Sequence, residues 1–310
     1  MFFSCIQSES LLEDRKTTSL FGILKSSSDT DMEITVLDAF LFDPDGSLDC
    51  YQQYEHPPRV IGTASGSGQK TILLIANSNK NRYDWADIRT LNSINGISFD
   101  LENERQIHPV MGMMKSITAG ESVSIDLHPL RSEIHLRSIS CDFSDKAYKG
   151  MKLTDVRIYL TYVNASCNII PKHPVQASRL INAGMLDERH LEQFEEKEMI
   201  MQEISTDIGR EKVLVERSLF CYANESEEET IGTPFTRLVI EGRIGGDMYY
   251  YPIRINPRGG GIADGCRYIF DIIITRAGAT DPDGNLQEED IEISMEIEKW
   301  KEKEWYEVEF

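Results

Sequence analysis

The first residues of the chain have types and an order that could carry a lipid. Phe3 and Ser4, an apolar and a small residue, precede Cys5, as at the end of a bacterial lipoprotein signal. The polar residues 7–10 then suit a tether. The stretch before Cys5 is too short to be a signal peptide by itself, so a lipid on Cys5 requires a start further upstream. The alternative is an ordinary cytosolic amino terminus with a chance cysteine, because one cysteine carries little information.

A Gly/Ser loop over residues 62–71 invites comparison with a phosphate-binding loop. A Walker loop needs adjacent glycine and lysine, but here Gln69 separates Gly68 from Lys70. Such a loop also leads into a helix that holds the phosphate, whereas the apolar run at 71–77 is typical of a strand. We interpret the loop as a flexible connection and expect no nucleotide cofactor.

Residue patterns typical of catalytic and metal sites are missing from the sequence. It has neither a G-x-S-x-G elbow nor an H-E-x-x-H pair. His128 and His135 flank one turn and could meet across a hairpin, or they could be separately solvated. The two Asp-Pro-Asp-Gly turns, 43–46 and 281–284, could bind calcium, but a type I turn explains their residues equally well. The sequence therefore predicts no enzyme, no metal site and no cofactor.

Charge and cysteine content further narrow the functional classes to which the protein could belong. The chain has 52 acidic and 32 basic residues and a formal charge of −20. This balance disfavours binding to duplex nucleic acid or to an anionic membrane surface, because both need cations. The six cysteines lack C-x-x-C spacing, and most are expected to be buried free thiols. No run of 18 apolar residues predicts a transmembrane helix.

Short apolar or alternating segments predict a chain that is mostly β-strand. The predicted strands are 34–42, 71–77, 123–127, 134–139, 156–162, 238–240, 248–255, 268–275, 291–297 and 305–310. Many short strands with turns between them are typical of a sandwich or barrel. Residues 176–204 are predicted to form one or two short amphipathic helices, with a domain boundary near 166–170.

Two further segments could form binding surfaces. Residues 305–310 place Tyr306, Val308 and Phe310 on one face of a terminal strand, and Trp305 precedes them. Such a strand needs a paired or shielded edge, so residues 291–310 either cap the chain's own sheet or are donated to a partner. The tyrosines at 249–251 could stack sugars or could pack in a core.

The order of several short motifs is similar to that of the fimbrillin superfamily of Bacteroidales. They span nearly the whole chain: Phe40–Gly46 with Ile75–Asn77, Pro109–Gly112 with Leu127–Arg131, Leu219–Asn224 with Tyr249–Ile253, and Arg267–Ile274 with Gly278–Asp283 and Trp300. One departure is Asp264-Gly-Cys-Arg267, where the family often has an Arg-Asn pair.

The resemblance implies an all-β fold of two transthyretin-like β-sandwich domains with a short helical insertion near the start of the second. We expect a tether at 1–17, a first domain at 18–166 and a second at 167–310, with the helical segment at 176–204. It also implies export as a lipoprotein to the outer membrane and surface fimbrium, with lipid on Cys5. For a stalk subunit it implies proteolytic processing at Arg15 or Lys16 and exchange of strands between pilus subunits, whereas an anchor subunit stays lipidated and uncut. Alternatively, Arg15 and Lys16 are a basic pair in a disordered tether. The alternative is a surface lipoprotein that binds glycans.

Overall fold

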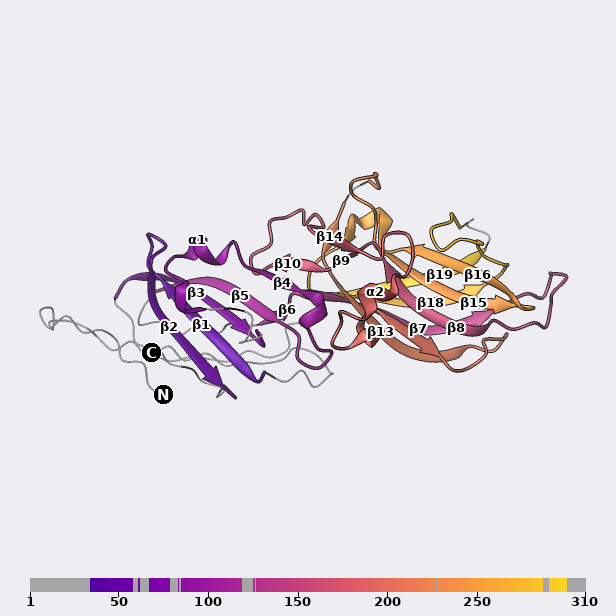
Figure 1. Cartoon of the computed structure of the whole chain (residues 1–310), viewed down its shortest axis with the longest axis horizontal. Helices are drawn as coiled ribbons and strands as arrows, with labels where there is room; N and C mark the ends of the chain where they lie inside the picture. The colour runs from indigo at the N-terminus through magenta and orange to yellow at the C-terminus, as the bar shows by residue number, and fades with distance from the viewer. Residues whose placement is uncertain are drawn as a thin grey trace, which may run out of the picture.

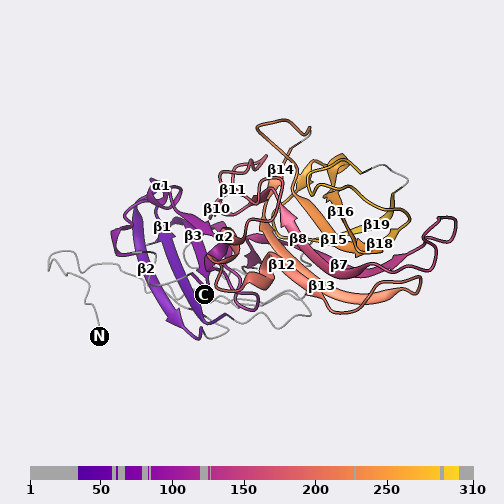
Figure 2. The same cartoon turned by 45° about the vertical axis from the view of Figure 1, so that its right-hand side comes forward.

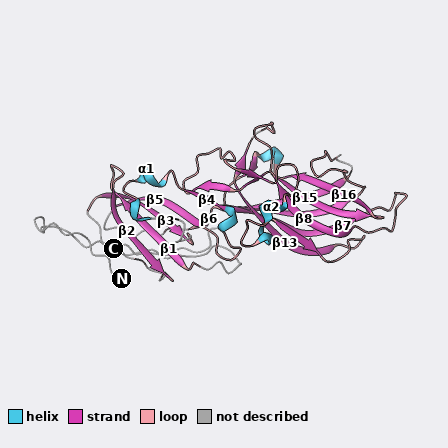
Figure 3. Cartoon of the chain, in the orientation of Figure 1, coloured by secondary structure: helices cyan, strands magenta, loops and turns pink. Residues whose placement is uncertain are grey.

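The computed structural model describes residues 34–57, 61, 67–78, 83, 85–118, 125, 127–226, 228–286 and 290–299. Within these residues the chain is mostly β-strand and forms an elongated molecule, with one sheet at one end and two more at the other (Figures 1 and 3). Several of the predicted site residues lie outside the described part: Cys5, Arg15, Lys16, Trp305, Tyr306, Val308 and Phe310. Most of the predicted strand 123–127 also lies outside it.

The first sheet is antiparallel throughout, with strand order β2-β1-β3-β5-β6. Its strands are β1 (Val36–Phe42), β2 (Leu48–Glu55), β3 (Gln69–Ala76), β5 (Met111–Thr118) and β6 (His128–Pro129). Successive side chains of a strand point to opposite faces, and both faces of β1 are buried. Phe40 and Phe42 join the larger core, whereas Leu37 and Leu41 join a separate apolar cluster on the other face.

Eight strands at the other end form two four-stranded sheets. One has the order β12-β8-β15-β16, with β12 (Met201–Ile204), β8 (Thr154–Thr161), β15 (Arg237–Ile244) and β16 (Asp247–Arg254). The other has the order β13-β7-β18-β19, with β13 (Val213–Tyr222), β7 (Arg131–Cys141), β18 (Cys266–Ile274) and β19 (Ile291–Lys299). Only the β7–β18 pair is parallel within these two sheets. Buried residues of both sheets, such as Ile158 and Phe270, share one core, so the sheets form a sandwich (Figure 2).

The remaining elements are short. Three two-stranded ladders pair β4 (Ser98–Asp100) with β10 (Ser166–Asn168), β9 (Val163–Asn164) with β11 (Leu180–Ile181), and β14 (Asn224–Glu225) with β17 (Gly261–Ile262). The helices are α1 (Leu91–Ile94), α2 (Glu188–Leu191), η1 (Trp85–Asp87), η2 (Leu101–Asn103), η3 (Lys197–Met199) and η4 (Pro257–Gly259). The side chains of Thr90 and Asp187 cap the two α-helices by accepting main-chain N–H bonds. None of the helices in the described ranges is long and apolar enough to cross a membrane.

A buried ion pair joins the segment between β4 and β5 to the sandwich. Arg131 Nη1 lies 3.2 Å from Glu104 Oε2, and the Tyr222 hydroxyl donates to Glu104 Oε1 at 2.5 Å. Arg131 also donates to the carbonyls of Arg105 and Gln106, at 2.9 and 2.6 Å. Burial raises the pKa of the Glu104 carboxyl and lowers that of the Arg131 guanidinium, and the attraction between the two groups opposes both shifts.

The observed strand pairing does not follow the expected domain boundary. The boundary expected at 166/167 separates β7 and β8 from strands of their own sheets, because β7 pairs with β13 and β18, and β8 with β12 and β15. The sheets themselves divide before Arg131. Hydrophobic patterning along the chain reports which residues are buried but not which distant strand they pair with, so the position of the division could not be read from it.

The helical stretch expected at 176–204 is also corrected. The described helices there are only α2 and the single turn η3, and the stretch also contains β11 and β12. Residues 201–204 pair with residues 156–159 of β8. This tertiary pairing overrides a local pattern that fits a helix or a strand over so few residues.

The predicted strands within the described ranges are otherwise found. The strand at 34–42 ends in the predicted Asp-Pro-Asp-Gly turn, where the Gly46 N–H donates to the Asp43 carbonyl at 2.8 Å. The second such turn is closed by a 3.0 Å bond from Gly284 N–H to the Asp281 carbonyl. The strands predicted at 71–77, 134–139, 156–162, 238–240, 248–255, 268–275 and 291–297 correspond to β3, β7, β8, β15, β16, β18 and β19.

Candidate functional site

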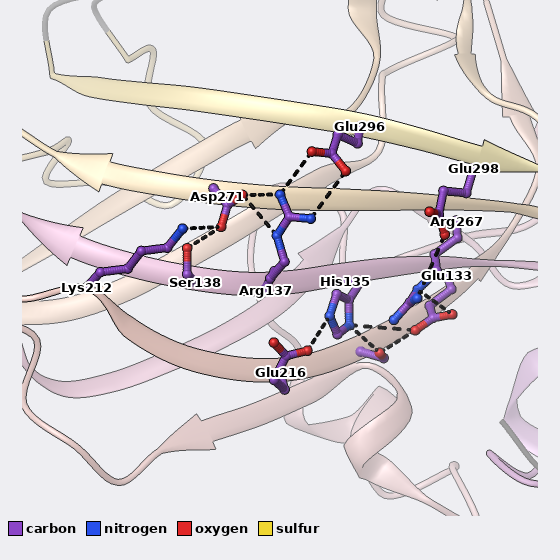
Figure 4. Close-up of polar contacts among 11 residues, drawn as sticks. Glu133, His135, Arg137, Ser138, Lys212, Glu216, Arg267, Asp271, Glu296 and Glu298 are labelled. Carbon is purple, nitrogen blue, oxygen red and sulfur yellow. Dashed lines mark hydrogen bonds and ion pairs between the residues drawn. The ribbon is translucent and has the colours of Figure 1, made fainter. Parts of the chain in front are cut away.

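The outer face of the β13-β7-β18-β19 sheet carries two clusters of charged and polar side chains, which together we call the outer network (Figure 4). Many apolar residues of these strands point into the sandwich, so the alternate residues point outward. The consecutive residues Arg137 and Ser138 both reach Asp271 because the register of β7 against β18 shifts at this point. The network comprises Glu133, His135, Arg137, Ser138, Lys212, Glu216, Ser218, Arg267, Asp271, Glu296 and Glu298. Its carboxylates outnumber its guanidinium and ammonium groups, so this face has an excess of negative charge.

Arg137 is the hub of one half of the outer network. Its guanidinium contacts Asp271 on β18 through Nε at 3.0 Å and through Nη2, and Glu296 on β19 at 3.0 and 3.2 Å. Asp271 also accepts from Ser138 and lies 3.2 Å from Lys212 Nζ. Hydrogen bonds from these groups, above all from Arg137, hold the pKa of the Asp271 carboxyl well below its usual range. The same guanidinium lowers the pKa of Glu296.

A β-bulge builds the other half. The register of β13 against β7 shifts between Leu214 and Arg217, and Glu216 has a φ of 48°. Bulges turn a side chain out of the regular alternation. Here the bulge brings Glu216 Oε2 within 2.9 Å of His135 Nε2, while Ser218 Oγ lies 2.9 Å from His135 Nδ1. Ser218 also donates to Glu133, which in turn lies 3.3 Å from Arg267 Nε.

The trio Ser218, His135 and Glu216 has the residue types of a nucleophilic triad, but its contacts suit a different role. The Ser218 hydroxyl donates to Glu133, so the acceptor of its proton is a carboxylate and not only the imidazole. The histidine is largely buried, at 5% exposure, between the two strands. Activation of a serine requires the base to take its proton and a donor set to receive an oxyanion. We therefore interpret the trio as a cross-strand polar tie.

The second part of the site is the side of β19 that has no strand partner among the described residues. β19 closes one end of its sheet and pairs with β18. On the inner face, the β18 residues opposite its apolar row are buried to 1% exposure or less, whereas Ile293 and Ile297 are 43% and 48% exposed. A groove of about 530 Å³ lies between this row and the opposite sheet, lined on the β19 side by Ile291, Ile293 and Met295.

The structure separates the tyrosines that could have formed a sugar platform. Tyr251 is fully buried, and its hydroxyl donates to the Arg276 carbonyl at 2.8 Å. Tyr249 packs against the same core, and the intervening Tyr250 lies on the opposite face of the strand. The three rings therefore do not form one exposed stack, and core packing accounts for two of them.

Other residues singled out in the sequence have local partners. His135 takes its place in the outer network, and the contacts of its ring nitrogens are to Ser218 and Glu216 and not to His128. In the second acidic turn, the Asp283 carboxylate accepts from Arg237 at 2.6 Å and from Tyr162 at 2.9 Å. In the first, Asp45 accepts from Ser47. The five described cysteines are free: Cys50, Cys141, Cys167, Cys221 and Cys266.

Sequence reasoning missed most of the outer network. Asp271 is the single charge within the apolar run 268–274, and that isolation is the signal that could have marked it, whereas Arg137 lies in a strand with other charged residues. Their mutual contact could not be inferred, because it depends on the parallel pairing of β7 and β18.

The chain has the fold of the Bacteroidales fimbrillins, so the resemblance seen in the sequence motifs is confirmed at the level of the fold. The solved structures that match include a fimbrilin from Porphyromonas gingivalis W83 (TM-score 0.68, 15% identity, 93% of this chain and 99% of that one). A candidate cell adhesion protein from Bacteroides eggerthii matches with TM-score 0.69 and 14% identity over 92% and 96% of the two chains. The tip fimbrial protein Mfa3 from P. gingivalis matches with TM-score 0.57 and 13% identity over 91% and 100%.

Comparison at the level of sequence gives no match. No family model matches the chain, and no curated protein matches it. The similarity is therefore carried by the fold.

Proposed function

We propose that this chain is a structural or adhesive subunit, or the membrane anchor, of a bacterial cell-surface pilus. The observation that carries the proposal is the match of nearly the whole chain, in one continuous fold, to fimbrillin structures. The described site adds to it, because a polar face and an open strand edge suit association between proteins and not turnover of a substrate. In this role the protein is exported, and its partners are other pilus subunits.

Association occurs by strand addition, with the terminal segment 300–310 as the donated part. Residues 291–299 already form β19 in the chain's own sheet, so of the segment 291–310 only the last residues are left to serve a neighbour. Tyr306, Val308 and Phe310 alternate with Glu307 and Glu309. An added strand gains main-chain hydrogen bonds along an edge, and its alternate side chains fill pockets.

Truncation tests this assembly. Deleting residues 303–310 from the full chain should abolish the higher oligomers recovered from the cell surface while the monomer keeps its thermal unfolding midpoint. A matched control replaces Glu307 and Glu309 with glutamine, which keeps the apolar row and should keep association. If the truncated protein still assembles, donation of the terminal strand is refuted.

Membrane anchoring belongs to the same proposal and has a separate test. Cys5 carries the lipid in an anchor subunit, whereas cleavage after Arg15 or Lys16 produces a released stalk subunit. One acyl chain holds a protein only weakly, and two or more hold it stably. Replacing Cys5 with serine should move the protein out of the outer-membrane fraction, and mass spectrometry of the mature amino terminus distinguishes the lipidated form from the cleaved one.

A further inference from the structure

The unpaired side of β19 differs from the other edge that borders the groove. β16, the end strand of the opposite sheet, contains Pro252, which has no N–H to donate, and its Tyr250 exchanges two main-chain hydrogen bonds with Ala279. Proline and a covering segment are two ways in which proteins block an edge. β19 contains no proline over its nine residues, and in the described part of the chain its only strand partner is β18. A strand entering the groove would therefore pair with β19.

The two faces of β19 impose different requirements on such a strand. On the inner face it would lie beside Ile293, Met295 and Ile297, which are the incompletely covered residues of the row. Apolar side chains at alternate positions would complete the cover of these residues and gain the free energy of burial. The inner face thus selects an apolar residue at every second position.

The outer face of β19 is acidic. Glu292, Glu296 and Glu298 point outward, and the guanidinium groups of Arg137 and Arg267 reach the last two from the far side, across the sheet. The side chains of a neighbouring strand would stand about 4.5–5.5 Å away at Cβ, close enough for opposite charges to attract and like charges to repel. Lysine or arginine at the outward positions is therefore favoured.

This charge requirement excludes two obvious occupants. The chain's own terminal segment, with Tyr306, Val308 and Phe310 turned inward, would place Glu307 and Glu309 beside the acidic face. Two copies of β19 paired with each other would also bring glutamates together. Like charges opposed across strands are destabilising and select against the wrong partner.

We propose that the free edge of β19 is a docking site for an extended segment of a different protein, in which apolar residues alternate with lysine or arginine. The proposal deepens the assembly described above and rests on it, since it assigns a second partner to a pilus subunit. The terminal segment and the β19 edge then serve different neighbours, which fixes the order of subunits in a fibre.

Binding of synthetic peptides to the purified full chain tests the proposal. The probes are a nine-residue peptide that alternates valine and lysine, the same peptide with glutamate for lysine, one with the lysines and valines in two blocks, and residues 303–310. Fluorescence anisotropy should show the alternating lysine peptide binding at least about tenfold more tightly than the others, with affinity that falls as salt rises. N-methylation of alternate amides should abolish its binding, because it removes the main-chain bonds.

Substitutions test whether the peptide binds at β19. Glu292→Lys should weaken the alternating lysine peptide about tenfold and strengthen the glutamate peptide. The matched control is Glu203→Lys, an exposed glutamate on the end strand β12, which should leave both affinities unchanged. Slower amide exchange in residues 291–299 upon binding would confirm the location.

Several outcomes would overturn the docking site. Equal affinity for the alternating and block peptides would show that the net charge of the protein alone explains the binding. Tighter binding of residues 303–310, or equal effects of the two lysine variants, would also refute it. These results leave the proposed pilus role intact, because the truncation experiment tests that role without the β19 edge.

Discussion

Arg137 Nη2 lies 3.0 Å from Glu296 Oε1, although strand β18 separates the two strands that carry these residues. The guanidinium reaches over β18 and contacts Asp271 on the way. One side chain thus ties together three strands, including the end strand β19 that borders the open groove. The link gives β19 an attachment besides its ladder to β18.

Removing this attachment should loosen β19. In Arg137→Ala, Glu296 loses its guanidinium partner and Asp271 loses the hydrogen bonds from Arg137, while the main-chain ladder between β18 and β19 remains. Amide hydrogen exchange in residues 291–299 should become several-fold faster, because local opening becomes easier. Exchange in β16 should not change.

The control for that variant is Arg243→Ala. Arg243 lies on β15, and its contacts, 3.6 Å to the largely exposed Asp155 and 2.8 Å to the Gly246 carbonyl, do not involve β19. Its loss should therefore leave exchange in β19 unaltered. Unchanged exchange in Arg137→Ala would show that the ladder alone holds the strand.

The lowered pKa of Asp271 predicts a pH dependence of stability. Because the folded pKa lies below the ordinary value of about 3.9, the charged carboxylate stabilises the folded state at all higher pH. That stabilisation is lost as pH falls through the folded pKa. In urea unfolding, the difference in free energy between the parent and Asp271→Asn should be constant above about pH 5 and shrink below about pH 4.

Asp247→Asn, at the exposed start of β16, serves as the comparison for the pH series. Its difference from the parent should stay small at every pH. A difference for Asp271→Asn that persists unchanged into acid would mean that the carboxylate charge does not stabilise the fold.

The buried ion pair at the junction should be costly to break. Arg131→Met leaves the Glu104 carboxylate buried without its cation and should lower the free energy of unfolding by about 3–5 kcal/mol. The double variant Arg131→Met/Glu104→Gln should recover part of this loss, because no uncompensated charge remains. Arg105→Ala removes an exposed contact to Glu195 and should cost less than about 1 kcal/mol.

A double variant that is no more stable than Arg131→Met would contradict this account. It would indicate that the arginine acts through its hydrogen bonds to the carbonyls of Arg105 and Gln106 and not through its charge.

Close packing at Gly242 predicts a steric effect. A Cβ at this position in β15 would lie 2.6 Å from Leu153 Cγ. Gly242→Ala should therefore destabilise the protein by about 1–3 kcal/mol, the usual cost of overpacking, and Leu153→Ala in the same chain should relieve the clash. Thermal unfolding checks the prediction.

Gly232→Ala is the matched control, since a Cβ there meets nothing within 4 Å. Equal melting temperatures for Gly242→Ala and Gly232→Ala would show that the core around Leu153 can move aside.

The sequence by itself determined the local part of the structure. Alternation of apolar with charged or polar residues identified β8 and β19, because a period of two is typical of a strand. The Asp-Pro-Asp-Gly residues identified the turn after β1 in the same way. The order of the motifs also carried the resemblance to the fimbrillin fold.

Only the tertiary structure decided the pairing of distant strands. The parallel contact of β7 with β18 creates the Arg137–Asp271 link, and the pairing of β12 with β8 turns part of an expected helix into a strand. The exposed fractions of Ile293 and Ile297 likewise depend on which distant residues the fold packs against them. The pattern of apolar and charged residues along the chain indicates that a side chain needs a partner. Which partner it finds is decided by the free energy of the whole packed fold.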